Sequence, residues 1–144
     1  MLFRRFALVA LIIGAIPVML MAQSAEDTAS RLFLELNAVR DEGGSCRLTF
    51  LARNGTGVAI DKAVFETVIF DTSGGVLSLS LMDFRDLPVE VPRVRQFDLP
   101  GMTCDALGQA LINGANSCVV DGVESAICHE ALSLSSRLSV ELLG

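Results

Sequence analysis

Residues 31–53 read RLFLELNAVRDEGGSCRLTFLAR, and this stretch decides the fold class. Apolar and polar side chains alternate over 31–38 and again over 45–53, which is the period of a strand with one buried face. Between the two runs lies DEGG, 41–44, whose residues are typical of a tight turn. We therefore expect two successive strands, paired as a hairpin or lying in facing sheets. The residues expected to face inward are Leu32, Leu34, Leu36, Ala38, Cys46, Leu48, Phe50 and Ala52.

The same alternation continues toward the C-terminus, interrupted by Gly, Pro, Asn and Asp. It predicts further strands over 63–70, 77–82, 94–99, 106–113 and 131–142. Prolines bracket the strand over 94–99, so we place its start at a sheet edge or a bulge. Gly108 weakens the segment 106–113, which is also compatible with a short helix.

Strands at this spacing, without amphipathic helices between them, predict an all-β fold. We expect a single antiparallel immunoglobulin-like β-sandwich of about seven strands, following an N-terminal signal helix. A small barrel is the alternative architecture.

The first 25 residues, MLFRRFALVALIIGAIPVMLMAQSA, have the three-part pattern of a secretory signal peptide. Two arginines precede an apolar run that is shorter than the ~20 residues of a comfortable membrane span. We predict cleavage between 22 and 25, which leaves 26–144 as one β-sandwich domain in the periplasm. An uncleaved segment would instead anchor the domain to the inner membrane, facing the periplasm. Phe6 directly follows the arginine pair, which favours the general secretory route over the twin-arginine route.

The charge of the exported part is acidic. Without the two arginines of the leader, nine basic residues remain against 17 acidic ones, a net charge of −8. Such a surface repels nucleic-acid phosphates and anionic lipid headgroups. We therefore expect no nucleic-acid partner, and membrane contact only through an uncleaved signal segment.

Four cysteines in an exported domain are candidates for two disulfides: Cys46, Cys104, Cys118 and Cys128. Three pairings are open, and the sequence does not choose among them. The turn at 121–122 lets the third and fourth cysteines close a hairpin-sized loop, which would leave the first two as a long-range pair. No two cysteines have the spacing of a zinc site. We expect no metal and no cofactor.

No catalytic set stands out from the sequence. The segment 69–74, IFDTSG, is similar to the Asp-Thr-Gly signature of aspartic proteases, but its glycine falls one place late and no second copy exists. A hairpin turn explains it. His129 is the single histidine, and no Gly-x-Ser-x-Gly elbow accompanies it. We predict that the protein is not an enzyme.

Two stretches carry a family resemblance. Residues 53–57 (RNGTG) and 65–76 (FETVIFDTSGGV) resemble small exported bacterial β-sandwich domains, in which an Asn-containing turn precedes a strand ending in aromatic-Asp-x-x-Gly. Residues 93–101 (RVRQFDLPG) with Cys104 resemble α-proteobacterial envelope proteins that are often labelled for a twin-arginine signal. The resemblance covers most of the mature chain. It implies a periplasmic sandwich and assigns no catalytic residue.

These observations favour a non-enzymatic periplasmic binding or structural domain. We expect the partner to be another envelope protein, because sheet edges readily accept an added strand. Two alternatives are a signal-anchored accessory subunit of an inner-membrane complex and a thiol- or metal-dependent redox accessory protein.

Overall fold

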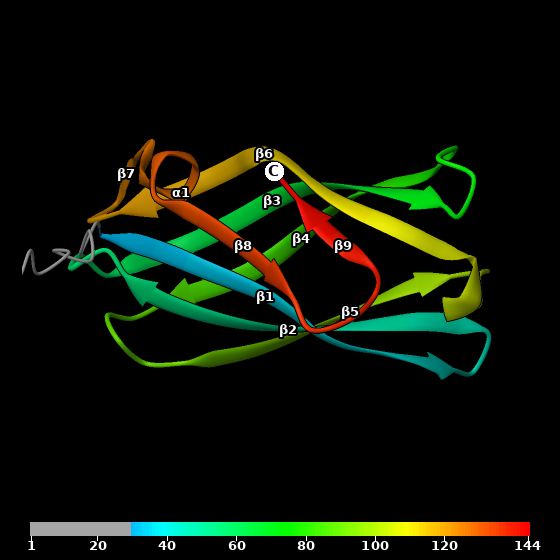
Figure 1. Ribbon diagram of the computed structural model, residues 1–144. Helices are drawn as coiled ribbons and strands as arrows, with labels where there is room; N and C mark the ends of the chain where they lie inside the picture. The colour runs from blue at the N-terminus through cyan, green and yellow to red at the C-terminus, as the bar shows by residue number, and fades with distance from the viewer. Residues whose placement is uncertain (1–29) are drawn as a thin grey trace, which may run out of the picture.

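The computed structural model describes residues 30–144, so the predicted signal peptide lies outside the described residues. The described chain is mostly strand, which confirms an all-β fold (Figure 1). Its elements in order are β1 (Arg31–Glu42), β2 (Ser45–Gly55), β3 (Ile60–Asp71), β4 (Val76–Leu87), β5 (Arg93–Pro100), η1 (Cys104–Ala106), β6 (Leu107–Val120), β7 (Val123–Glu124), α1 (Ile127–Glu130), β8 (Leu132–Ser136) and β9 (Glu141–Leu143).

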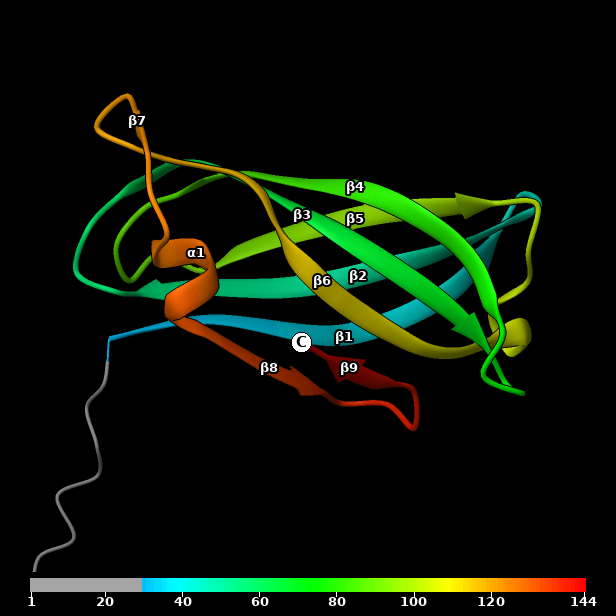
Figure 2. The ribbon, with the colours of Figure 1, turned by 90° about the horizontal axis from the view of Figure 1, so that it is seen from above.

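The strands form two sheets that lie face to face (Figure 2). The first has the order β5-β2-β1-β8, and the second has the order β4-β3-β6-β7 with β9 also paired to β6. β1 and β2 form an antiparallel hairpin, so the first two predicted strands share one sheet. Their alternate apolar residues lie in a core that both sheets contribute to. Only Ala38, of the residues expected to face inward, is not fully enclosed, because a bulge follows Leu36.

The prediction of purely antiparallel sheets is wrong, because the expected last strand, 131–142, is divided. Its first part, β8, pairs in parallel with β1, and its last part, β9, pairs in parallel with β6. The hydroxyl of Ser136 donates to the carbonyl of Val140 at 2.6 Å and accepts the amide of Leu138 at 3.1 Å. Such local bonds replace the strand ladder with a turn. The chain therefore crosses from one sheet to the other between 136 and 141, and both sheets are mixed.

The segment 106–113 is part of a strand, β6, and not a helix. Its glycine is required by the packing of the hairpin beside it. A Cβ atom on Gly108 would lie 2.1 Å from the carbonyl oxygen of Asp71, well inside van der Waals contact. The residue that weakens the strand pattern in the sequence thus permits the close approach of β6 to the end of β3.

Four phenylalanines join the two sheets. The rings of Phe50 and Phe84 lie 5.4 Å apart in an edge-to-face contact, and Phe65 meets Phe84 at 5.5 Å. Phe97 completes the group, 5.1 Å from Phe84 and 5.9 Å from Phe50. Because these rings come from β2, β3, β4 and β5, one aromatic cluster fixes four strands of both layers.

Asn54 connects two of the places where the chain changes sheets. Its side chain is fully buried at the end of β2, and its Nδ2 donates to the carbonyls of Val58 and Leu87, each at 2.7 Å. Its Oδ1 accepts the amide and the hydroxyl of Thr56, at 3.0 and 2.6 Å. Its backbone carbonyl accepts the amide of Glu90 at 2.8 Å. The β2–β3 and β4–β5 crossovers are therefore held by one residue.

Replacing Asn54 with Ala is expected to lower the free energy of unfolding by about 3 kcal/mol, because it leaves buried backbone and hydroxyl groups without partners. The matched control is Asn37→Ala, whose side chain is half-buried and bonds only to Glu35, with an expected loss below about 1 kcal/mol. Urea unfolding of the two variants measures the difference. Equal losses would contradict the role assigned to Asn54.

Candidate functional site

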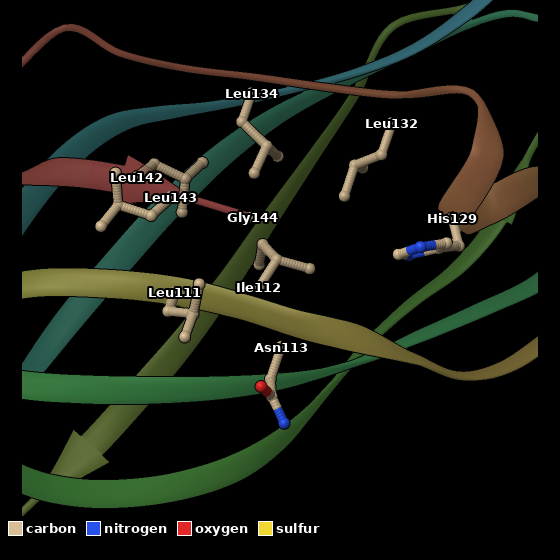
Figure 3. A pocket seen from close by; sticks show the side chains of 9 residues that line it. All are labelled: Leu111, Ile112, Asn113, His129, Leu132, Leu134, Leu142, Leu143 and Gly144. Carbon is tan, nitrogen blue, oxygen red and sulfur yellow. The ribbon is translucent and has the colours of Figure 1, made fainter.

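A hollow of about 550 Å³ lies between α1, β6, β8 and β9 (Figure 3). Ile112, Leu132 and Leu134 converge on it, and the imidazole of His129 points into it from α1. Asn113 points away from it, and its amide donates to the carboxylate of Glu66. No Ser, Cys, Asp or Glu lines the hollow, so within the described chain it offers His129 no nucleophile and no orienting acid.

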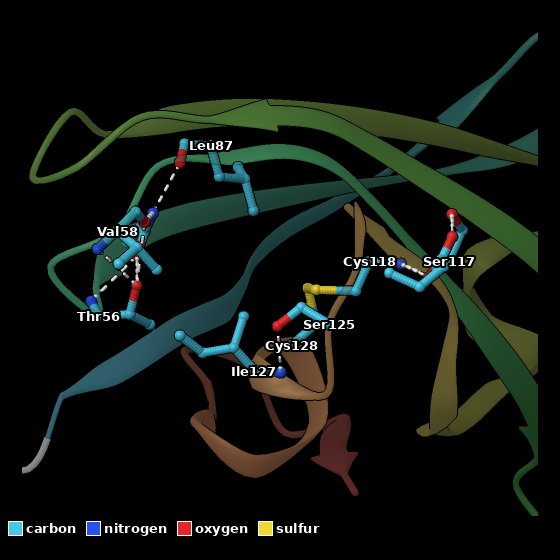
Figure 4. The surroundings of a disulfide bond; sticks show 10 residues. Thr56, Val58, Leu87, Ser117, Cys118, Ser125, Ile127 and Cys128 are labelled. Carbon is cyan, nitrogen blue, oxygen red and sulfur yellow. Dashed lines mark hydrogen bonds between the residues drawn. A yellow bond between two sulfur atoms is a disulfide. The ribbon is translucent and has the colours of Figure 1, made fainter. Parts of the chain in front are cut away.

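The four candidate cysteines form two disulfides. Cys46 bonds to Cys104 with a Cα–Cα distance of 4.8 Å, and Cys118 bonds to Cys128 with a Cα–Cα distance of 5.9 Å (Figure 4). The pairing is thus one long-range bond and one hairpin-sized loop. Cys46, Cys118 and Cys128 are almost completely enclosed in the core. Their buried positions are typical of structural disulfides, and a thiolate reagent has little access to their sulfur atoms.

Strand β4 is an open edge of the second sheet, since it pairs only with β3 among the described residues. Three leucines on its outer face are about half exposed: Leu77 at 45%, Leu79 at 57% and Leu81 at 56%. In the pairing register Leu79 lies opposite Val68, Val68 opposite Leu111, and Leu111 opposite Leu143. Residues directly opposite each other share one face. An aliphatic row therefore crosses the whole sheet and ends at the β4 edge.

The other sheet edges are protected. β5 is flanked by Pro92 and ends at Pro100, and it carries two arginines and an aspartate. β7, β8 and β9 are only 2, 5 and 3 residues long. Proline, charge and short length are the usual means by which proteins keep an edge from pairing. By contrast, residues 72–82 contain no charge and no proline. Within the described chain, β4 is the long terminal strand of a sheet that lacks these protections.

Arg95 divides the β4 edge into a closed and an open part. Its Nε donates to the carbonyl of Phe84 at 2.7 Å, and its Nη2 donates to the carbonyl of Asp86 at 3.2 Å. The guanidinium thus occupies backbone acceptors that an added strand would use. Arg85 takes a left-handed conformation, with φ of 60°, which ends the regular pleat. The regular register from Ser78 to Asp83 remains open.

An acidic turn lies at the other end of the open part. The Oδ1 of Asp71 accepts the amides of Ser73 and Gly75, each at 2.8 Å, and the hydroxyl of Ser73 at 2.7 Å. The Ser73 hydroxyl and these two backbone amides lower the pKa of Asp71 below its usual value. The motif that is similar to an aspartic-protease signature is therefore a hairpin turn whose carboxylate stays ionised.

The sequence pattern did not identify this edge. Alternation shows that the three leucines share a face, but the face that β4 buries carries Ser78, Ser80, Met82 and Phe84. Phe84 belongs to the aromatic cluster and fixes which side of the strand faces the core. The exposed row could have been found from the alternation of serines and leucines together with Phe84, which lies on the same face of the strand as the serines.

Replacing both cysteines of a pair with Ala is expected to destabilise the protein more for the longer loop. In the chain-entropy model the loss is about 4 kcal/mol for Cys46–Cys104, with a separation of 58 residues, and about 3 kcal/mol for Cys118–Cys128, with a separation of 10. Urea unfolding of the two double variants measures the losses. A larger loss for the short loop would contradict the entropic explanation.

Replacing Asp71 with Asn is expected to reduce stability at pH 7 more than at pH 3. A carboxylate with a lowered pKa stabilises the fold above its unfolded pKa, and this contribution disappears as the pH falls through the folded pKa. The amide keeps the acceptor oxygen but not the charge. Thermal unfolding of both proteins at the two pH values measures the difference. A gap between the two melting temperatures that does not change with pH would count against this role.

No protein-family model, curated protein sequence or solved structure matches this chain. In the described residues no helix has the length and apolar character needed to cross a membrane. No cluster of three or more His, Cys, Asp or Glu side chains in that part of the chain is placed to hold a metal ion. The strongest feature with functional character is therefore the open edge of β4, from Ser78 to Asp83.

Proposed function

We propose that this protein is a non-enzymatic periplasmic binding domain that recruits another protein chain of the envelope by strand addition. In this mode an extended segment pairs with a free sheet edge, and alternate side chains give specificity. The observation that carries the proposal is the open β4 edge with its three half-exposed leucines. An added strand would both satisfy the free backbone groups and extend the aliphatic row.

The proposal includes an immunoglobulin-like β-sandwich as the scaffold. Its support is the arrangement of two facing sheets, the crossovers held at Asn54 and the long-range disulfide between β2 and η1. Such a scaffold presents its edges rigidly because four strands are fixed by the phenylalanine cluster. A rigid edge lowers the entropy lost when a partner strand binds.

An enzymatic or redox role receives less support from the geometry. His129 faces an aliphatic hollow, and the aspartate of the protease-like motif is bound inside its own turn. Three of the four disulfide sulfurs belong to residues enclosed in the core. The β4 edge needs no such chemistry, since binding there uses backbone hydrogen bonds and apolar contact.

In-cell photo-cross-linking tests the proposal. With Leu79 replaced by a photoreactive phenylalanine derivative, irradiation is expected to give a covalent adduct with a second polypeptide. The same derivative at Val123, which is 67% exposed on β7 at the opposite edge of the sheet, is the matched control and is expected to give roughly tenfold less adduct. Equal labelling from both positions, or none from position 79, would exclude the β4 edge as the binding surface.

A further inference from the structure

We infer that the chain that adds to the β4 edge is a second copy of this protein, paired antiparallel about a two-fold axis near Ser80. The inference rests on the proposed function, because it identifies the partner of the same edge. Three features of β4 support it: the self-complementary row of leucines, the length of the open segment and the opposite charges at its two ends.

The leucine row can pair with itself in an antiparallel register centred on Ser80, which keeps every pair within the regular part of β4. Residues opposite each other in an antiparallel pair share a face, so residue numbers must pair odd with odd to keep both rows on the outer face. Centring the pair on Ser80 places Leu79 of each copy opposite Leu81 of the other. Ser80 then meets Ser80, and Ser78 meets Met82, on the inner face. Each copy thus covers Leu79 and Leu81 of the other, while Leu77 lies at the end of the ladder opposite Asp83.

The open segment has the length that this register needs. β4 keeps a regular register with β3 from Ser78 to Asp83, and a shift follows beyond each end. Pairing about Ser80 uses 78–82 of both copies. The carbonyls of Phe84 and Asp86, which Arg95 already occupies, remain outside the shared ladder. The guanidinium cap therefore limits the pairing without blocking it.

The ends of the open segment have complementary charges. Beyond the 78–82 ladder, the antiparallel arrangement brings the Arg85 end of one copy toward the turn of the other, where the carboxylate of Asp71 binds the amide of Gly75. At the Arg85 end, Asp86 lies 3.6 Å from both Arg93 and Arg95, while Asp83 accepts the Arg85 amide. This end has three arginines (Arg85, Arg93 and Arg95) and two aspartates (Asp83 and Asp86), so it carries one excess positive charge. In an antiparallel pair, each copy brings its anionic turn near the positively charged end of the other copy. The two-fold axis makes this contact occur twice.

The net charge of −8 on the exported chain opposes association, but it acts at longer range. At an ionic strength of ~0.15 M the screening length is about 8 Å, so charges distributed over the two surfaces are largely screened. Contacts between the strand ends lie within that length. We therefore expect self-association to weaken when the salt concentration is lowered well below the physiological value.

Two complementary variants test the pairing and its register. Leu79→Lys and Leu81→Glu each place a charge opposite a leucine at two points of the homodimer. Each is expected to weaken dimerisation about 100-fold, tenfold for each leucine pair that the charge disrupts. In an equimolar mixture the introduced lysine faces the introduced glutamate, while the remaining Leu79 faces the remaining Leu81. The mixture is therefore expected to form a heterodimer. Val123→Lys is the control and stays dimeric.

Sedimentation of the exported protein from ~1 µM to ~1 mM gives the readout. A native dimer, weakened in both single variants and restored in their mixture, supports the inference. A native dimer that neither variant weakens overturns it. A native monomer whose position-79 cross-link joins a different protein also overturns it, while the proposed function stands. A native monomer with no cross-link from position 79 overturns both.

Discussion

The buried amide of Asn54 is the interaction on which the two-layer arrangement depends. The chain leaves the first sheet after β2 and returns to it before β5, and both crossovers end in hydrogen bonds to this residue. A fully buried amide uses all of its donors and acceptors only when its surroundings have one arrangement. Asn54 thus fixes the position of β4 relative to β2, and through it the place of the Phe84 ring in the core. Because the Phe84 ring packs into the core, the opposite face of β4, which carries the leucines, is exposed to solvent.

Sequence reasoning predicted the local features and missed those that depend on distant contacts. Period-two alternation placed Leu32, Leu48 and Phe50 in the core correctly, and all three are fully buried. It failed for the C-terminal segment because one hydroxyl, on Ser136, turns the chain between two sheets. It also did not decide which face of β4 packs into the core, because an alternating pattern of serines and leucines does not say which set of side chains points inward. The cap that Arg95 places on β4 depends on the loop between β4 and β5, and no local pattern indicates it.

The β4 edge combines features that proteins usually keep apart. A long aliphatic edge is a hazard for uncontrolled pairing, and the remaining edges of the described chain are short or carry charge and proline. On β4 the protection covers only the C-terminal part, where Arg95 binds the backbone. Under the proposed function, a fold that protects the other terminal strands of its sheets and half of β4 would limit strand addition to a single short ladder. In the proposed function, this selective exposure is the basis of recognition.

The parallel pairing of β8 with β1 has a consequence for how the protein is made. Leu32 lies beside Leu132, so the first described strand obtains its second neighbour only after about a hundred further residues have been synthesised. Contacts across such a long stretch of chain slow folding, because the intervening loop must be closed before the contact forms. An N-terminal fragment of this chain therefore lacks one side of its own first sheet. The later strand β8 completes the sheet that β1 begins, so the first sheet closes only after β8 has been made.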